Sequence, residues 1–299
     1  MDEGGGGPSP SGLPRRTALI AAAAVGGLAA ATAGAVTGML PGFGLTRSLA
    51  GSRVGPATTG GVVRTERVYS QARGRELELL TILPSAVLTE RLPVCVALHG
   101  LHGDARAVAA GGLPAFLSTA VADRTVPPFA VVALDGGDSY WHEHHRGDDP
   151  MGMLIYELPG WLAERGLTPQ PFAATGISMG GFGALYYARR RRQWARPLRA
   201  VAVIAPALIT TWTEMRKREA FHSPADWAAY DPLHNLNALG DVPTAIWCGS
   251  EDPFVPGARR FIATAHPRTS SITPGAHDDH YFRKALPEAV QFLGAHLTG

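Results

Sequence analysis

Residues 176–180, Gly-Ile-Ser-Met-Gly, follow the pattern Gly-x-Ser-x-Gly and constrain the fold more than any other segment. This pattern is typical of a strained turn from a strand into a helix, with the serine at its apex. The glycines two residues before and after the serine leave room that a Cβ would fill. The flanks agree, because 171–175 is an apolar run suited to a buried strand and 182–188 continues as a helix. We therefore predict that Ser178 is reactive; the alternative is a glycine-rich turn that carries a serine by chance.

Size and composition are those of a globular protein with a substantial core. The chain has 299 residues, of which 45% are hydrophobic and 17% charged, enough for one large α/β domain. Its net charge of +2 is too small to indicate a nucleic-acid partner. The run Arg189–Arg192 lies near the expected end of the helix after Ser178, where cations complement the helix dipole. We interpret this run as structural; a surface that binds membranes or polyanions is the alternative.

The first 40 residues resemble an export signal. The pair Arg15-Arg16 precedes an Ala- and Gly-rich stretch with no charge until Arg47, as in twin-arginine signals. The alternative is a membrane anchor, because the uncharged run exceeds the ~20 residues that a spanning helix needs. Its richness in Ala, Gly and Thr favours export to the cell envelope or the medium, with membrane association through this segment as the alternative. Residues 41–60 have the composition of a linker, and we expect residues 61–299 to form the folded domain.

The two cysteines, Cys95 and Cys248, each lie in an apolar run that we expect to form a central strand. Intervening strands would hold their Cα atoms farther apart than the ~7 Å that a disulfide allows. We therefore predict two buried free thiols.

Strand-like apolar runs alternate with helical segments along the domain. Their apolarity is continuous rather than alternating, which indicates a mostly parallel sheet with helices on both faces. The Gly-x-Ser-x-Gly turn follows the third of these runs, and this order predicts an α/β-hydrolase fold, preceded by an antiparallel pair. The pair is expected at 61–70 and 76–83, the later strands at 93–99, 129–134, 172–177, 200–206, 244–248 and 269–273, and the helices at 104–122, 151–165, 179–192, 223–230, 255–265 and 280–297.

In this fold the catalytic acid follows a later strand and the histidine follows the last one. Asp252 comes after the 244–248 strand and directly before a proline that sets a turn, whereas Glu251 is one residue too early for the usual spacing. His277 lies in the loop after the last expected strand, whereas His280 begins the final helix. The predicted catalytic residues are Ser178, Asp252 and His277.

An oxyanion hole needs two backbone N–H groups that point at the developing negative charge. Met179, directly after the serine, supplies one from the start of a helix. The loop after the 93–99 strand, residues 99–104, supplies the second, and we predict Leu101 as its donor because the loop glycines let the backbone turn inward.

The segment 140–149 is rich in groups that can bind metals. The helical zinc pattern His-Glu-x-x-His would need a histidine at position 146, where this chain has Arg146. The segment leaves the carboxyl edge of the sheet beside the serine, where α/β folds bind ligands. We predict that Tyr140, Trp141 and His142 form a wall of the substrate pocket; a plain surface loop and a metal site are the alternatives.

With these residues assigned, residues 60–299 resemble the esterase family that joins esterase D-like and feruloyl esterases with the mycolyltransferases of the antigen 85 type. One segment, Glu157–Leu162, is similar to the mycolyltransferase branch in particular, and Gly180-Gly181 is more like the general esterases. The resemblance is carried by Leu98–Leu101, Asp138–Trp141, Glu157–Leu162, Gly176–Gly181 and Gly275–Asp278, in the family's order.

The resemblance implies an α/β-hydrolase fold and acyl-ester chemistry without a cofactor, and from the residues themselves we expect no metal. Mycolyltransferases have an acidic residue and an arginine at two positions that help to hold the sugar acceptor. This chain has His99 and His102 there, so both are candidate pocket residues and trehalose specificity is not implied. We expect hydrolysis of an ester, such as a lipid or carbohydrate ester, through a covalent acyl-enzyme. Transfer of the acyl group to a sugar or alcohol, and a catalytically silent binding domain of the envelope, are the alternatives.

Overall fold

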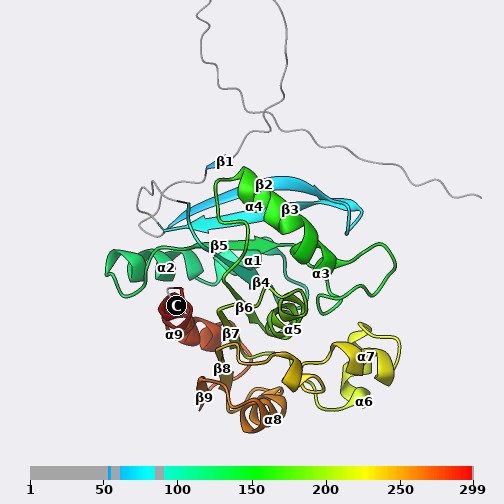
Figure 1. Ribbon diagram of the computed structural model, residues 1–299. Helices are drawn as coiled ribbons and strands as arrows, with labels where there is room; N and C mark the ends of the chain where they lie inside the picture. Colours follow the sequence, from blue (N-terminus) through cyan, green and yellow to red (C-terminus); the bar gives the residue numbers. More distant parts are fainter. Residues whose placement is uncertain (1–52, 55–60, 85–90, 298–299) are drawn as a thin grey trace, which may run out of the picture. The chain divides into compact units, whose positions relative to one another are not determined.

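A central sheet of nine strands organises the part of the chain that the computed structural model describes, which is residues 53–54, 61–84 and 91–297 (Figure 1). The strand order is β1-β2-β3-β5-β4-β6-β7-β8-β9. Strands β1 to β3 and β5 pair antiparallel, and all pairs from β5 to β9 are parallel. The bounds are β1 Arg53–Val54, β2 Val62–Ser70, β3 Arg75–Leu83, β4 Val94–Leu98, β5 Ala130–Leu134, β6 Ala173–Ile177, β7 Ala200–Ile204, β8 Thr244–Gly249 and β9 Thr269–Thr273. This confirms the predicted antiparallel pair and the mostly parallel sheet.

Helices cover both faces of this sheet, as predicted. Side chains of one strand point alternately to the two faces: Val96 of β4 packs in a core with α3, α4, α5 and α8, and Ala97 packs in another with α1, α2 and α9. Figure 1 shows α2 and α9 on one side of the sheet and α5 on the other. The helices are α1 Ala105–Ala110, α2 Leu113–Ala122, α3 Pro150–Gly152, α4 Leu158–Glu164, α5 Met179–Gln193, α6 Trp212–Met215, α7 Pro224–Tyr230, α8 Val255–Ala265 and α9 Asp279–Ala295. In the described residues, no helix is long and apolar enough to cross a bilayer.

Two expected helices differ from the prediction. The segment 104–122 is two helices, because α1 ends at Ala110 and Gly112 takes a left-handed backbone with φ of 96° before α2 begins. The segment 151–165 is interrupted by a π-helical turn at Met153–Glu157. Pro159 has no N–H to donate to the preceding turn, and the Leu158 N–H instead donates to the Met153 carbonyl five residues back.

The cysteines have the environment that we predicted, whereas two arginines of the run Arg189–Arg192 are buried rather than solvated. Cys95 and Cys248 are buried free thiols on β4 and β8, with β6 and β7 between them. Burial raises the pKa of Cys248 to about 12.

Arg189 and Arg191 are buried and donate to the Ala229 and Arg196 carbonyls at 2.8 and 3.0 Å, respectively. These bonds tie the end of α5 to α7 and to the segment that follows α5. The predicted export signal, residues 1–40, lies outside the described residues, and of the predicted linker only β1 is described.

Glu157, which belongs to the mycolyltransferase-like segment, connects the π-helical turn to the β2–β3 hairpin. Its Oε1 accepts the Ala72 N–H at 2.9 Å, and its Oε2 accepts the Ser70 hydroxyl at 2.5 Å. Ser70 is buried, so both the hydroxyl and the amide depend on this one carboxylate. The structure therefore gives Glu157 a role in fixing the hairpin.

Glu157→Ala should lower the free energy of unfolding by about 3 kcal/mol, because two bonds to a charged acceptor are lost and their donors are left without a partner. Urea unfolding followed by circular dichroism measures this change. Glu164→Ala, on the exposed side of α4, is the matched control and should change stability by less than about 0.5 kcal/mol. Equal effects of the two substitutions would contradict the assigned role.

Candidate active site

Ser178 stands at the turn between β6 and α5, with a backbone φ of 56° and ψ of −121°. Such a conformation is costly for a residue with a side chain and persists only when its surroundings enforce it. A Cβ on Gly176 would lie 2.1 Å from the Gly180 carbonyl oxygen, and one on Gly180 would lie 1.9 Å from the Leu98 carbonyl oxygen. Only glycine fits at either position, which is the physical reason for the Gly-x-Ser-x-Gly pattern.

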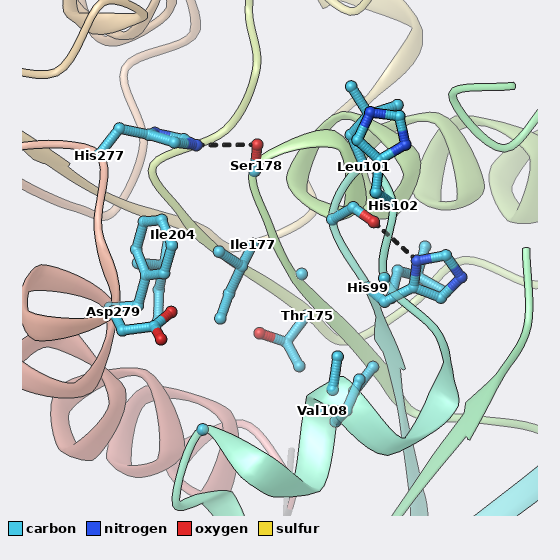
Figure 2. Close-up of a pocket in the computed structure, with 18 of the residues that line it drawn as sticks. His99, Leu101, His102, Val108, Thr175, Ile177, Ser178, Ile204, His277 and Asp279 are labelled. Carbon is cyan, nitrogen blue, oxygen red and sulfur yellow. Dashed lines mark hydrogen bonds between the residues drawn. The ribbon is translucent and has the colours of Figure 1, made fainter. Parts of the chain in front are cut away.

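The structure brings Ser178, His277 and Asp252 into one hydrogen-bonded chain. The Ser178 Oγ lies 2.9 Å from His277 Nε2, a contact that Figure 2 marks with a dashed line. On the other side of the ring, His277 Nδ1 lies 2.6 Å from Asp252 Oδ2. A carboxylate only accepts, so Nδ1 carries the proton and Nε2 presents its lone pair to the Ser178 hydroxyl. Asp252 follows β8 and His277 follows β9, in the predicted order.

Packing fixes the two partners of Ser178. Asp252 is 2% exposed, and its second oxygen, Oδ1, accepts the Phe254 N–H at 2.7 Å. The rings of Phe254 and Phe282 stand nearly perpendicular to the His277 ring, with centroids 4.9 and 5.0 Å away. The imidazole therefore makes a T-shaped aromatic contact with each of the two phenyl rings. Glu251 and His280, the competing candidates, have exposed side chains and are not part of this hydrogen-bonded chain.

The turn after β4 lies directly against the serine. A Cβ on Gly100 would be 3.5 Å from the Ser178 Cβ, and Leu101 lines the same cavity as Ser178. Met179 is the first residue of α5, where backbone N–H groups have no partner within the helix. The positions of Leu101 and Met179 thus suit the oxyanion role that the sequence predicts for them.

His99 ties this turn to the neighbouring loop. Its Nε2 accepts the Gly136 N–H at 2.8 Å, so the proton is on Nδ1, which donates to the Gly100 carbonyl at 2.8 Å. Burial lowers the pKa of His99, which agrees with a neutral ring. His99 borders the cavity, but both of its nitrogens are engaged. His102, by contrast, is exposed at the cavity and is held by Asp138, whose carboxylate accepts its backbone N–H at 2.6 Å and its Nδ1–H at 3.1 Å.

Of the three residues predicted to form the pocket wall, Tyr140 borders the cavity, whereas Trp141 and His142 do not and pack in the core instead. Tyr140 lines the cavity beside Ser178, and burial raises its pKa to about 12. Trp141 is 0% exposed, because its indole fills the space beside two glycines, Gly136 and Gly183. His142 stacks on Phe221, with ring centroids 4.4 Å apart, and donates from Nε2 to the Ala220 carbonyl at 2.6 Å.

Some residues that border the cavity were not singled out from the sequence. The cavity has a volume of about 640 Å³, within the range of small-molecule sites. Phe254, Phe282 and Arg218 border it, and so does one side of α1. No motif marks these residues as part of the site, since they come together only when the segments that follow β7, β8 and β9 converge on Ser178. In the described part of the chain, no three His, Cys, Asp or Glu side chains are grouped so that they could hold a metal ion.

Fold and site together define an α/β-hydrolase. A family model named Esterase, described as "Putative esterase", matches residues 70–293, and the chain belongs to this family. The comparison with curated proteins finds no match.

Solved structures show the same fold at low sequence identity. An S-formylglutathione hydrolase from Agrobacterium tumefaciens is 16% identical, with a TM-score of 0.68 over 83% of this chain and 99% of that one. A ferulic acid esterase is 18% identical, with a TM-score of 0.65 over 80% of this chain and 100% of that one. MPT51 (FbpC1) of Mycobacterium tuberculosis is 18% identical, with a TM-score of 0.61 over 78% of this chain and 99% of that one.

A group of histidines beside the site makes stability depend on pH. The ring of His144 stacks on that of His222, with centroids 4.3 Å apart, and the Nδ1 atoms of His142 and His144 are buried without a hydrogen-bond partner. Burial lowers the pKa of His142, and burial followed by the neighbouring histidines lowers that of His144. Below pH about 6.5 the unfolded chain therefore binds protons that the folded chain does not. The contribution of these neutral histidines to the free energy of unfolding is fully present above that pH and is lost as the pH falls from there through their folded pKa values.

The melting temperature should accordingly fall as pH is lowered below about 6.5, and His144→Gln should flatten this decline. Scanning calorimetry at closely spaced pH values measures both profiles. His280→Gln, at an exposed position, is the control and should keep the wild-type profile. A melting temperature that is constant over this range would contradict the interpretation.

Proposed function

We propose that the protein is a serine esterase that hydrolyses carboxylic esters, with Ser178 as nucleophile, His277 as general base and acid, and Asp252 as the group that orients His277. The observation that carries the proposal is the continuous hydrogen-bonded chain from Ser178 Oγ through both ring nitrogens of His277 to Asp252, at the border of a cavity. Membership of the esterase family supports the same chemistry.

The mechanism follows from the donors and acceptors of this chain. As Ser178 Oγ attacks the ester carbonyl carbon, its proton passes to His277 Nε2, and Asp252 stabilises the resulting imidazolium through Nδ1–H. The tetrahedral intermediate breaks its bond to the alcohol oxygen, which takes the proton from Nε2 and leaves. The acyl group is now esterified to Ser178. Water then attacks the acyl-enzyme, again giving a proton to His277, and the carboxylic acid is released when Ser178 regains its proton.

The negative charge on the carbonyl oxygen is stabilised by the backbone N–H groups of Met179 and Leu101. Each donor of this kind contributes about 3 kcal/mol to the lowering of the barrier. His99 supports the second donor indirectly, because its neutral ring holds the Gly100 carbonyl on one side and the Gly136 amide on the other. His99 is therefore a positioning residue rather than one that contacts the ester.

Hydrolysis is favoured over acyl transfer by the exposure of the cavity border. His102 and Arg218, at this border, are exposed to solvent, so water has access to an acyl-enzyme at Ser178. Transfer would use the same intermediate with an alcohol or sugar in place of water. A silent binding domain would have no need for the Ser178–His277–Asp252 alignment.

We also propose export through residues 1–40. N-terminal sequencing of the protein from fractionated cells tests this proposal: a cytoplasmic protein that retains Met1 would contradict export.

The test of the esterase is steady-state hydrolysis of p-nitrophenyl esters by the triad variants. Ser178→Ala should lower kcat by about 10⁶-fold and Asp252→Asn by about 10⁴-fold, with melting temperatures checked to show that both variants fold. Glu251→Gln, on the neighbouring exposed carboxylate, is the matched control and should keep wild-type kcat. Retained activity in Ser178→Ala would refute the proposal, and new esters formed in the presence of added alcohols or sugars would favour transfer.

A further inference from the structure

The cavity at Ser178 extends to the side of the sheet that α1 and α9 cover. Figure 2 shows Ser178 and His277 at one end, Ile177 and Thr175 beyond them, and Val108 of α1 at the far end. We call this part the α1/α9 chamber. Its border includes the apolar side chains of Val108, Leu113, Ile177, Ile204, Phe282 and Leu286. The chamber thus joins the serine to an apolar space.

The chamber exists because α1 is short and carries small side chains on this side. Ala107 and Ala110 border it, and so does Gly111, which follows the last residue of α1. The sequence predicts a single helix over 104–122. Instead the chain turns at the Gly111–Gly112 break, and a Cβ on Gly111 would have no neighbour closer than 3.9 Å.

The polar groups at the border of the chamber either form hydrogen bonds within the protein or bring charges of opposite sign. The Thr175 hydroxyl donates to the Ala202 carbonyl at 2.8 Å, which leaves it without a proton to offer a ligand. Asp279 and Arg283, one turn apart on α9, bring opposite charges to the exposed edge. The Arg283 guanidinium donates to the Ala110 carbonyl at 3.3 Å and so spans from α9 to α1. Because these two charges are opposite in sign, they add no net charge to the border, and the rest of the chamber offers apolar contact that suits a hydrocarbon.

We propose that the α1/α9 chamber holds the acyl half of the substrate, and that this acyl group is an unbranched aliphatic chain. The inference rests on the proposed function, since it takes Ser178 as the atom to which the chain is attached. An extended chain that starts at the Ser178 ester passes Ile177 and Ile204 on the sheet and reaches Val108 and Leu286 between the helices. The alcohol half then leaves along the remaining border of the cavity, which includes Tyr140 and Arg218.

The test compares p-nitrophenyl acetate, butyrate, hexanoate and octanoate. For the wild-type protein, kcat/KM should rise by up to about fourfold for each methylene that the chamber buries. Ala107→Leu and Ala110→Leu place a larger side chain on the α1 border at exposed helical positions, where leucine is well tolerated. Each should lower the octanoate-to-acetate ratio of kcat/KM by at least about tenfold.

Ala163→Leu, at an exposed position of α4 away from the cavity, is the matched control and should keep the wild-type ratio. A wild-type ratio that does not rise with chain length, or variants that keep that ratio, would overturn the proposal. Calorimetric titration with octanoate and butyrate gives a readout that does not depend on turnover. Octanoate that binds more tightly than butyrate, and that binds more weakly to Ala110→Leu, supports the chamber even if no ester is hydrolysed. The absence of ester hydrolysis would refute only the esterase proposal. Equal binding of both acids to the wild-type protein would overturn the chamber.

Discussion

The close approach of α5 to the end of β4 is the constraint on which the rest of the site depends. Gly180 has the Leu98 carbonyl where a Cβ would be, and Gly176 has the Gly180 carbonyl in the same way. Because neither residue carries a Cβ, α5 can begin directly at the end of β6. Ser178, at the N-terminus of α5, is held in a strained conformation with a positive φ of 56°. The same approach brings the turn after β4 against Ser178, so the serine and both expected oxyanion donors share one small region.

Two buried aromatic side chains, His99 and Trp141, hold the turn after β4 in place. His99 connects the turn after β4 to Gly136 beyond β5, and the Trp141 indole packs between Gly136 and Gly183 of α5. The indole N–H points to the His99 carbonyl at 3.4 Å. Two loops and one helix are therefore linked through rings that are almost fully buried. This bracing explains why residues that resemble family binding positions, such as His99, here act mainly on the shape of the site.

Sequence patterns predicted those parts of the fold that depend on local chemistry. The Gly-x-Ser-x-Gly turn, the apolar strands and the placement of Asp252 and His277 follow from backbone sterics, burial and chain order, and the structure brings these residues together. Trp141 and His142 could not be placed this way, because an aromatic residue in a loop can face either a pocket or the core. The break at Gly112 and the π-helical turn before Pro159 each depend on a single residue. A helical pattern is judged over about ten or more residues, so it does not reveal an interruption at one of them. The chamber depends on the first of these interruptions, since α1 stops at its border, next to Gly111.

The central claim is that Ser178 is the residue that His277 and the strained turn make nucleophilic. Labelling of the folded protein with a fluorophosphonate, followed by peptide mass spectrometry, tests it most directly. The account predicts a single adduct on Ser178, no adduct in Ser178→Ala, and labelling that is strongly slowed in His277→Ala. An unlabelled wild-type protein, or equal labelling of Ser178→Ala, would contradict it.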